Sequence, residues 1–250
     1  MMPLPVIQDK FECCRCGACC TNIRTLHQDA KEQRIIFRIP DNEGTGLPLW
    51  PWEAERLRKI AEERGIDASI EPLQFFYDKK GKQGVIVSYH LNSNSCPFYK
   101  PGECTVYGQR PHVCRMFPLI SSGIFEFRFG RQPRFARTVC NSDSGAGCYE
   151  AGNAKDFAGR MRQYYDDSFI VAVQNDIINY FIASKIKELT QEGVIDPVIA
   201  PRELALGRFE KSGKISFMQL LEENGENAEE LAETFKSLRD AESLVGSLTS

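Results

Sequence analysis

Residues 11–20, FECCRCGACC, place five cysteines within ten positions, and this run constrains the fold more than any other feature. Cys13, Cys16 and Cys19 form the pattern C-x2-C-x2-C, and Cys20 follows directly. A two-residue spacer lets successive thiolates point toward one centre, and the small Gly17 and Ala18 leave backbone amides free to hydrogen-bond sulfur. Such a run adds little to packing. It therefore predicts chemistry: disulfides, a zinc site, an iron–sulfur cluster or thiol catalysis.

The cellular compartment decides between disulfides and metal chemistry. The chain begins MMPLPVIQDK, without the basic segment and apolar run of a secretory signal peptide. No window approaches the run of about 18 uninterrupted apolar residues that a membrane span requires. We therefore expect a cytoplasmic protein with no membrane association. Thiols stay reduced in the cytoplasm, so a dense cysteine pattern there favours a metal or redox site over disulfides.

The spacing of the cysteines favours iron over zinc. A C-x2-C-x2-C run opens the bacterial ferredoxin-type motif, in which a remote Cys-Pro completes cluster ligation. Cys96–Pro97 can supply that remote ligand here. A tetrahedral zinc site usually needs only one C-x2-C pair and a second, distant pair. The pattern thus predicts an iron–sulfur cluster of the [4Fe–4S] type, and zinc stays open as the alternative cofactor.

The cysteine blocks taken together carry a family resemblance. FECCRCGACC, CPFY, CTVYGQRPHVCRMFP and Cys140 occur in this order. The chain resembles the CxxCxxCC cysteine-cluster family of YkgJ-like proteins, described as a zinc- or iron-chelating domain, over residues 11–140. The cluster is also similar to that of flagellin lysine N-methylases, although no S-adenosylmethionine motif is visible here. The resemblance implies that the metal ligands are Cys13, Cys16, Cys19, Cys20, Cys96, Cys104, Cys114 and Cys140.

Further residues of the third block match the family pattern, while two cysteines do not. The matching residues are Tyr107, Arg110, Pro111, Arg115, Phe117 and Pro118. Cys14 and Cys148 are extra to the pattern and are spare thiols, substitute ligands or part of a second site. The eight family-type cysteines suit two four-ligand sites, or one site with a separate thiol pair, and spacing does not divide them.

Arg110, Arg115 and His112 lie close to Cys114 in the sequence and are the candidate cofactor-binding residues. An iron–sulfur cluster with four thiolates is anionic, so nearby guanidinium groups would shift its reduction potential or dock an anionic substrate. Alternatively, these arginines form salt bridges with the acidic end of the chain, where eight acids face two bases from Leu221 onward. The histidine is either a ligand, a hydrogen-bond donor to sulfur, or an ordinary satisfied side chain.

Charge disfavours several classes of partner. The formal net charge of −3 predicts no general attraction to nucleic acid or to an anionic membrane. Residues 110–137 are locally basic, with six arginines against one glutamate, and phenylalanines are interleaved with them. That composition would suit single-stranded nucleic acid, but no RNA-binding module is recognisable, so nucleic acid is disfavoured. A protein partner or substrate stays open.

Hydrophobic periodicity predicts an α+β fold in two regions. No cysteine follows Cys148, which favours a metal-binding domain over residues 1–150 and a helical region over 151–250. The first region should hold a helix at 51–65, a hairpin at 73–91 turning at 79–84, and a half-buried strand at 123–130. The second should hold a long helical segment at 154–193 broken near 166–168, a short helix at 216–225 capped by Ser216, and one acidic helix at 227–246.

These observations predict a metal-binding cysteine-cluster protein with a redox or modification-supporting role. The alternative is a zinc-stabilised structural or interaction module without catalytic activity. His27 and His90 show no ligand spacing and are expected to be ordinary histidines. The chain has no nucleophile elbow, no HExxH and no P-loop, so its motifs identify no reaction.

Overall fold

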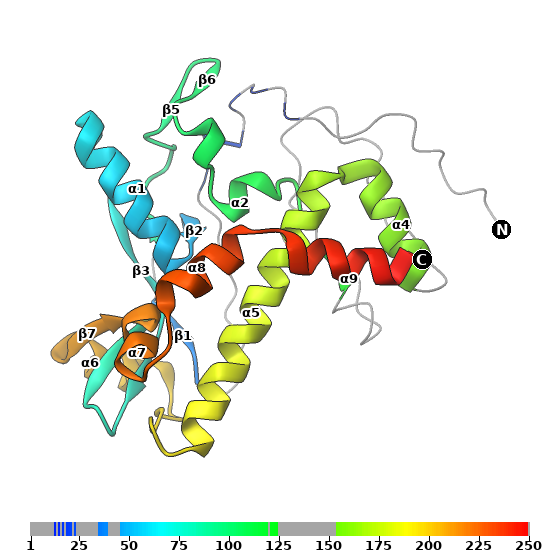
Figure 1. Ribbon diagram of the computed structural model, residues 1–250. Coiled ribbons are helices and arrows are strands. Elements are labelled where there is room, and N and C mark those ends of the chain that lie inside the picture. Colours follow the sequence, from blue (N-terminus) through cyan, green and yellow to red (C-terminus); the bar gives the residue numbers. More distant parts are fainter. Residues whose placement is uncertain are drawn as a thin grey trace. The chain divides into compact units, whose positions relative to one another are not determined.

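The structure is a computed structural model that describes residues 13, 15, 17, 19–21, 23, 35–39, 46–119, 121–124 and 154–249 (Figure 1). These residues group into two compact units. The first unit takes residues from Met1–Cys19, Pro101–Phe181 and Glu233–Ser250, and the second from Cys20–Lys100 and Ile182–Ala232. Each unit thus draws on both sides of residue 150. The predicted boundary at 150 lies outside the described residues and stays a prediction.

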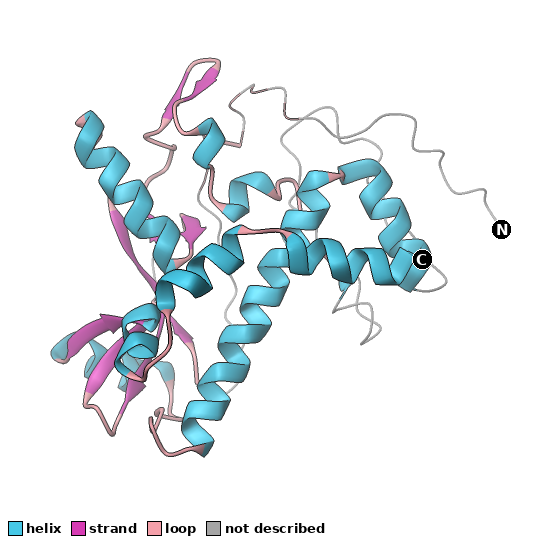
Figure 2. Ribbon diagram, viewed as in Figure 1, coloured by secondary structure: helices cyan, strands magenta, loops and turns pink. Residues whose placement is uncertain are grey.

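The second unit is built on a mainly antiparallel sheet, drawn in magenta in Figure 2. Its strand order is β1–β3–β4–β2, and β7 pairs in parallel with β4. The strands are β1 (Phe37–Arg38), β2 (Leu47–Leu49), β3 (Ile70–Asp78), β4 (Gln83–Leu91) and β7 (Gly213–Ser216).

The hairpin of β3 and β4 confirms the one predicted from the sequence. Asp78 pairs with Gln83 at its turn end. The Asp78 carboxylate accepts the backbone N–H groups of Lys80 and Gly81 at 3.0 and 2.8 Å. An aspartate that hydrogen-bonds the following backbone closes a turn locally, which explains why the turn could be predicted without tertiary information.

Helix α1 (Pro51–Arg64) confirms the helix predicted at 51–65. The Glu53 carboxylate accepts the backbone N–H of Trp50 at 3.0 Å, so the first turn is closed by a residue inside the helix. Gly65 ends the helix with a left-handed φ of 61°, a conformation that glycine adopts without strain. Leu57 and Ile60 are buried and give the helix its apolar face.

An aromatic core joins the sheet to α6 (Arg202–Lys211) within the second unit. Phe75 on β3 is fully buried, and its ring centroid lies 4.2 Å from that of Phe209 on α6 and 5.8 Å from that of Phe37. Gly84 allows this approach, because a Cβ atom there would lie 2.4 Å from the Phe209 ring. The glycine is needed for close packing of helix on sheet.

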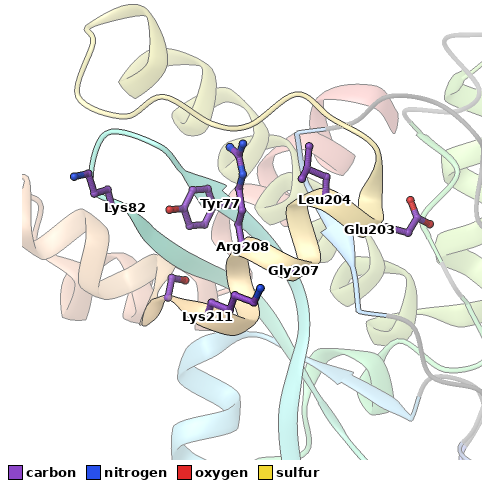
Figure 3. A pocket seen from close by; sticks show the side chains of 8 residues that line it. Tyr77, Lys82, Glu203, Leu204, Gly207, Arg208 and Lys211 are labelled. Atoms are coloured by element: carbon purple, nitrogen blue, oxygen red, sulfur yellow. The ribbon is translucent and has the colours of Figure 1, made fainter.

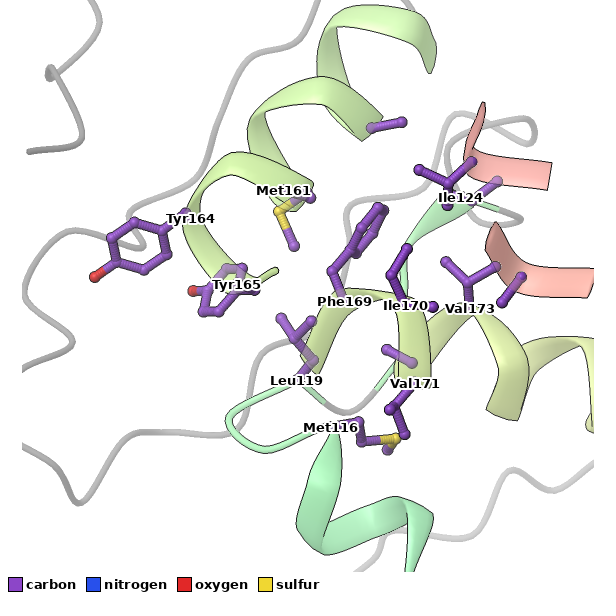
Figure 4. Close-up of a cluster of buried hydrophobic side chains, with 14 of the residues drawn as sticks. Met116, Leu119, Ile124, Met161, Tyr164, Tyr165, Phe169, Ile170, Val171 and Val173 are labelled. Atoms are coloured by element: carbon purple, nitrogen blue, oxygen red, sulfur yellow. The ribbon is translucent and has the colours of Figure 1, made fainter. Parts of the chain in front are cut away.

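The first unit packs α4 (Ala154–Tyr165), the start of α5 (Asp167–Gln191) and α9 (Arg239–Thr249) around one apolar core. The predicted break in the long helical segment is confirmed at Asp166, which has a φ of 43°. Figure 4 shows the core side chains drawn from both sides of the break. The labelled members are Met116, Leu119, Ile124, Met161, Tyr164, Tyr165, Phe169, Ile170, Val171 and Val173.

The acidic helix predicted at 227–246 is wrong in its length, because the structure has two helices there. α8 (Ala228–Lys236) ends before Ser237, whose Oγ donates to the carbonyl of Thr234 at 3.0 Å. Leu238 then packs against the core of the first unit before α9 begins. Acidic residues in the first turn of α9 favour a new helix N-terminus there. Most of the predicted strand at 123–130 lies outside the described residues.

Helix α7 (Phe217–Glu223) confirms the predicted short helix and its cap. Ser216 Oγ accepts the Gln219 N–H at 3.1 Å, and Gln219 Oε1 accepts the Ser216 N–H at 2.8 Å. We expect Ser216→Ala to lower the free energy of unfolding by about 1 kcal/mol in chemical denaturation, because one helix N–H loses its partner. Ser216→Asp keeps an acceptor and should stay near wild type. An equal loss in both variants would contradict the cap.

The remaining short elements are β5 (Tyr99–Lys100), β6 (Glu103–Cys104), the 3-10 helix η1 (Tyr107–Gln109) and α2 (His112–Arg115). Together with the helices and sheet, they make the predicted α+β fold class correct. Of the helices in the described residues, none combines the length and apolarity needed to cross a membrane.

Candidate metal centre

In the second unit, the end of the cysteine run lies beside the remote Cys96. The Cys96 N–H donates to the carbonyl of Cys20 at 2.7 Å, and the Ile23 N–H donates to the carbonyl of Asn94 at 3.1 Å. Cys20 and Cys96 are both partly exposed. These two segments are far apart in the sequence. The backbone hydrogen bonds bring Cys20 close to Cys96, the predicted remote ligand.

The local sequence explains why Cys96 is held in place. β4 ends at Leu91, and the Tyr99 N–H closes a turn onto the carbonyl of Cys96 at 3.1 Å. Pro97 occupies the second position of this turn, where its fixed φ is favourable. Phe98 is 1% exposed and anchors the turn in the apolar interior. The sequence Cys-Pro-Phe thus places a thiol on a short hydrogen-bonded turn.

In the first unit, the third cysteine block forms a compact chain of turns. The Cys114 N–H donates to the carbonyl of Pro111 at 3.0 Å, which places this cysteine in the single turn of α2. Met116 follows and enters the core of the unit, with Val113 packed against that core. Cys104 lies on β6 and is partly exposed. Val113 and Met116 therefore anchor the backbone around Cys114 to the core of the first unit.

The first unit also brings the cysteine run to the third block. The Arg15 guanidinium lies over the Tyr107 ring, with Cζ 4.1 Å from the ring centroid. Arg110 Cζ lies 3.9 Å from the same centroid, and its Nε donates to the carbonyl of Tyr107 at 3.2 Å. Arg15 stands between Cys14 and Cys16 in the sequence. No local sequence pattern indicates this contact, because the aromatic partner of Arg15 lies in a distant segment.

The predicted ligand set is only partly within the described residues. Cys16 and Cys140 lie outside them, as do the extra Cys14 and Cys148 and also His27. Cys13 and Cys19 of the run belong to the first unit, whereas Cys20 belongs to the second. In the part of the chain that the structure describes, no three His, Cys, Asp or Glu side chains form a group that could hold a metal ion. The ligand set stays a prediction.

The predicted cofactor-binding residues lie in or next to α2. His112 is 3% exposed, while Arg110 and Arg115 are partly exposed. Their role toward a cofactor stays a prediction. His90 is buried on β4, and its Nδ1 accepts the Gly46 N–H at 3.1 Å, as expected for an ordinary core histidine.

A recess of 390 Å³ lies in the second unit, between the β3–β4 turn and α6 (Figure 3). The Arg208 guanidinium lies 5.9 Å from the Tyr77 ring centroid, and the Glu203 carboxylate points away from that ring. The lining is largely basic and polar: Tyr77, Lys82, Glu203, Leu204, Gly207, Arg208, Lys211 and Ser212. It contains none of the candidate metal ligands.

A family model whose description reads "CxxCxxCC: Putative zinc- or iron-chelating domain" matches residues 12–140. The chain belongs to the CxxCxxCC family. The matched segment contains every family-type cysteine and excludes Cys148. No curated protein and no solved structure matches the chain.

Membership of this family supports metal binding by the chain, with zinc and iron both within the family description. The donor atoms suit either metal. Thiolates are soft ligands that select zinc and iron–sulfur clusters over magnesium or calcium. The pairing of Cys20 with Cys96 adds that two donors from separate blocks lie on neighbouring backbone, which a chelating site requires. The chemistry of the cysteine donor set therefore suits a thiolate-bound metal.

Proposed function

We propose that the chain binds an iron–sulfur cluster of the [4Fe–4S] type through its family-type cysteines and serves a redox or modification-supporting role in the reducing cytoplasm. The observation that carries the proposal is the 2.7 Å hydrogen bond from the Cys96 N–H to the Cys20 carbonyl. It joins the end of the C-x2-C-x2-C run to a remote Cys-Pro, which is the combination that completes ligation in ferredoxin-type motifs.

The surrounding residues support a cluster in two ways. Pro97 and the buried Phe98 restrain the Cys96 turn, which lowers the entropy lost when a metal is bound. Arg110 and Arg115 flank Cys114 and would offset the negative charge of a thiolate-bound cluster. When bound, such a cluster supplies single-electron transfer at a potential that nearby charge and hydrogen bonds adjust. His112 would act as a hydrogen-bond donor or ligand in the same block.

Metal analysis of anaerobically purified protein tests the proposal. The full chain should be brown, with the broad visible absorption of sulfide-to-iron charge transfer, and should contain about four iron and four sulfide per cluster. Dithionite should bleach that absorption. A colourless chain that retains stoichiometric zinc, and that gains no colour on reconstitution with iron and sulfide, would overturn the iron proposal. It would favour the zinc-stabilised module instead.

A further inference from the structure

Tyr107 is the meeting point of two guanidinium groups that come from separate blocks of the family sequence. Arg15 Cζ lies 4.1 Å and Arg110 Cζ 3.9 Å from the Tyr107 ring centroid. Both distances are well inside the range of about 6 Å over which an aromatic ring attracts a cation. The tyrosine ring is therefore a shared partner for two positive charges.

The two arginines reach the ring by different means. Arg110 is a near neighbour in sequence, and its Nε bond to the Tyr107 carbonyl holds the guanidinium in place. Arg15 belongs to the cysteine run and reaches the ring only through the tertiary fold. Among the described residues, neither guanidinium is paired with a carboxylate. The negative face of the ring thus provides the local compensation for these charges.

The backbone of Arg15 is left-handed where its side chain reaches the Tyr107 ring. Its φ is 55°, in the left-handed region that glycine enters freely and other residues enter at a cost. Gly17, two residues later, also has a left-handed φ, of 78°, which glycine adopts without strain. At residue 15 the chain instead carries an arginine, whose guanidinium stacks on Tyr107.

We infer that Tyr107 is a positioning residue for the proposed metal centre. Its ring contacts both Arg15 and Arg110, an arrangement we call the clasp, and so holds the cysteine run at Arg15 against the block that contains Cys104 and Cys114. This inference rests on the proposed function for the metal itself. The clasp gives Arg15, and with it the cysteine run, a tertiary contact within the first unit.

Metal release tests the clasp in the full chain. Tyr107→Leu removes the aromatic face, and we expect the loss of bound metal to a competing chelator to become about tenfold faster. Tyr107→Phe keeps the face and loses only the hydroxyl, so its release rate should match wild type. Equal release rates for Tyr107→Leu and wild type would overturn the inference. So would a Tyr107→Phe variant as fast as Tyr107→Leu.

Arg15→Gly distinguishes a backbone effect from a side-chain effect, because the two predict different changes in the rate of metal release. If only the backbone mattered, glycine would relieve the left-handed conformation, and metal release would slow or stay unchanged. If the clasp holds the cysteine run at Arg15, metal release should become about threefold faster, because the contact between the Arg15 guanidinium and the Tyr107 ring is lost. Arg15→Lys keeps a cation and should lie between Arg15→Gly and wild type. The double variant Arg15→Gly with Tyr107→Leu should release metal no faster than Tyr107→Leu alone.

Amide hydrogen exchange of the peptide at residues 11–20 separates this inference from the proposed function. In metal-free protein, Tyr107→Leu should exchange faster in that peptide, and Tyr107→Phe should not. If the chain holds no iron–sulfur cluster but shows this difference in exchange, the inference about the clasp stands and the proposed cluster is wrong. A chain that holds the cluster but shows equal exchange and equal release in all variants would overturn the clasp alone.

Discussion

Replacing Cys96 with serine is expected to remove most of the bound metal, lowering occupancy at least about tenfold, because serine is a poor ligand for the soft metals that thiolates bind. Cys96 is the residue whose backbone pairs with Cys20, so the variant deletes one donor while the loop stays attached. Iron, sulfide and zinc content of the anaerobically purified variant measures the effect. Retention of full metal content would remove Cys96 from the ligand set.

The matched control for this variant is Cys148→Ser. Cys148 lies beyond the matched family segment of 12–140, so its replacement should leave metal content unchanged. Far-UV circular dichroism then shows whether Cys96→Ser still folds. We expect most helicity to remain, because α4 and α5 pack in a core that contains no cysteine among its described members. A lower melting temperature with retained helicity would agree with metal binding that contributes to folding.

Phe75→Ala should cause the largest loss of stability from a single core residue, about 3–5 kcal/mol in the free energy of unfolding. Phe75 is fully buried and packs against Phe209 at 4.2 Å and Phe37 at 5.8 Å between ring centroids. Its removal leaves a cavity between β3 and α6, since neighbours on a rigid sheet cannot collapse into it. Urea denaturation followed by tryptophan fluorescence and circular dichroism measures the change.

Tyr180→Ala provides the comparison for Phe75→Ala. Tyr180 is also aromatic, but it is 68% exposed on α5, so its truncation should change stability by about 0.5 kcal/mol or less. Similar losses for the two variants would show that burial of Phe75 in the sheet core does not control stability.

Elements closed by local interactions could be predicted from the sequence. The turn after Asp78, the end of α1 at Gly65 and the cap at Ser216 all depend on groups within a few residues of one another. The break predicted near 166–168 lies at Asp166, whose backbone φ is 43°. Short-range hydrogen bonds and backbone preferences determine these features whatever the rest of the chain does.

Long-range contacts decided what local patterns did not predict. Strand β7 pairs with β4 across a separation of more than a hundred residues, and α6 reaches the sheet because Gly84 leaves room for Phe209. Leu238, between α8 and α9, is partly buried against the core of the first unit, whereas continuous helical periodicity predicted a single helix there. Hydrophobic burial of this kind is non-directional, so the sequence pattern does not reveal which surface a side chain will meet.

The candidate metal centre also has features that could be predicted from the sequence and features that only long-range contacts decided. By itself, the sequence determined which thiols are available and the family, because the C-x2-C-x2-C and remote Cys-Pro spacings are properties of the chain before it folds. Only the tertiary structure decided that Cys20 pairs with Cys96, and that Arg15 stacks on Tyr107. Both contacts join segments distant in sequence, and they form only when burial and backbone pairing have offset the entropy of closing the intervening loops.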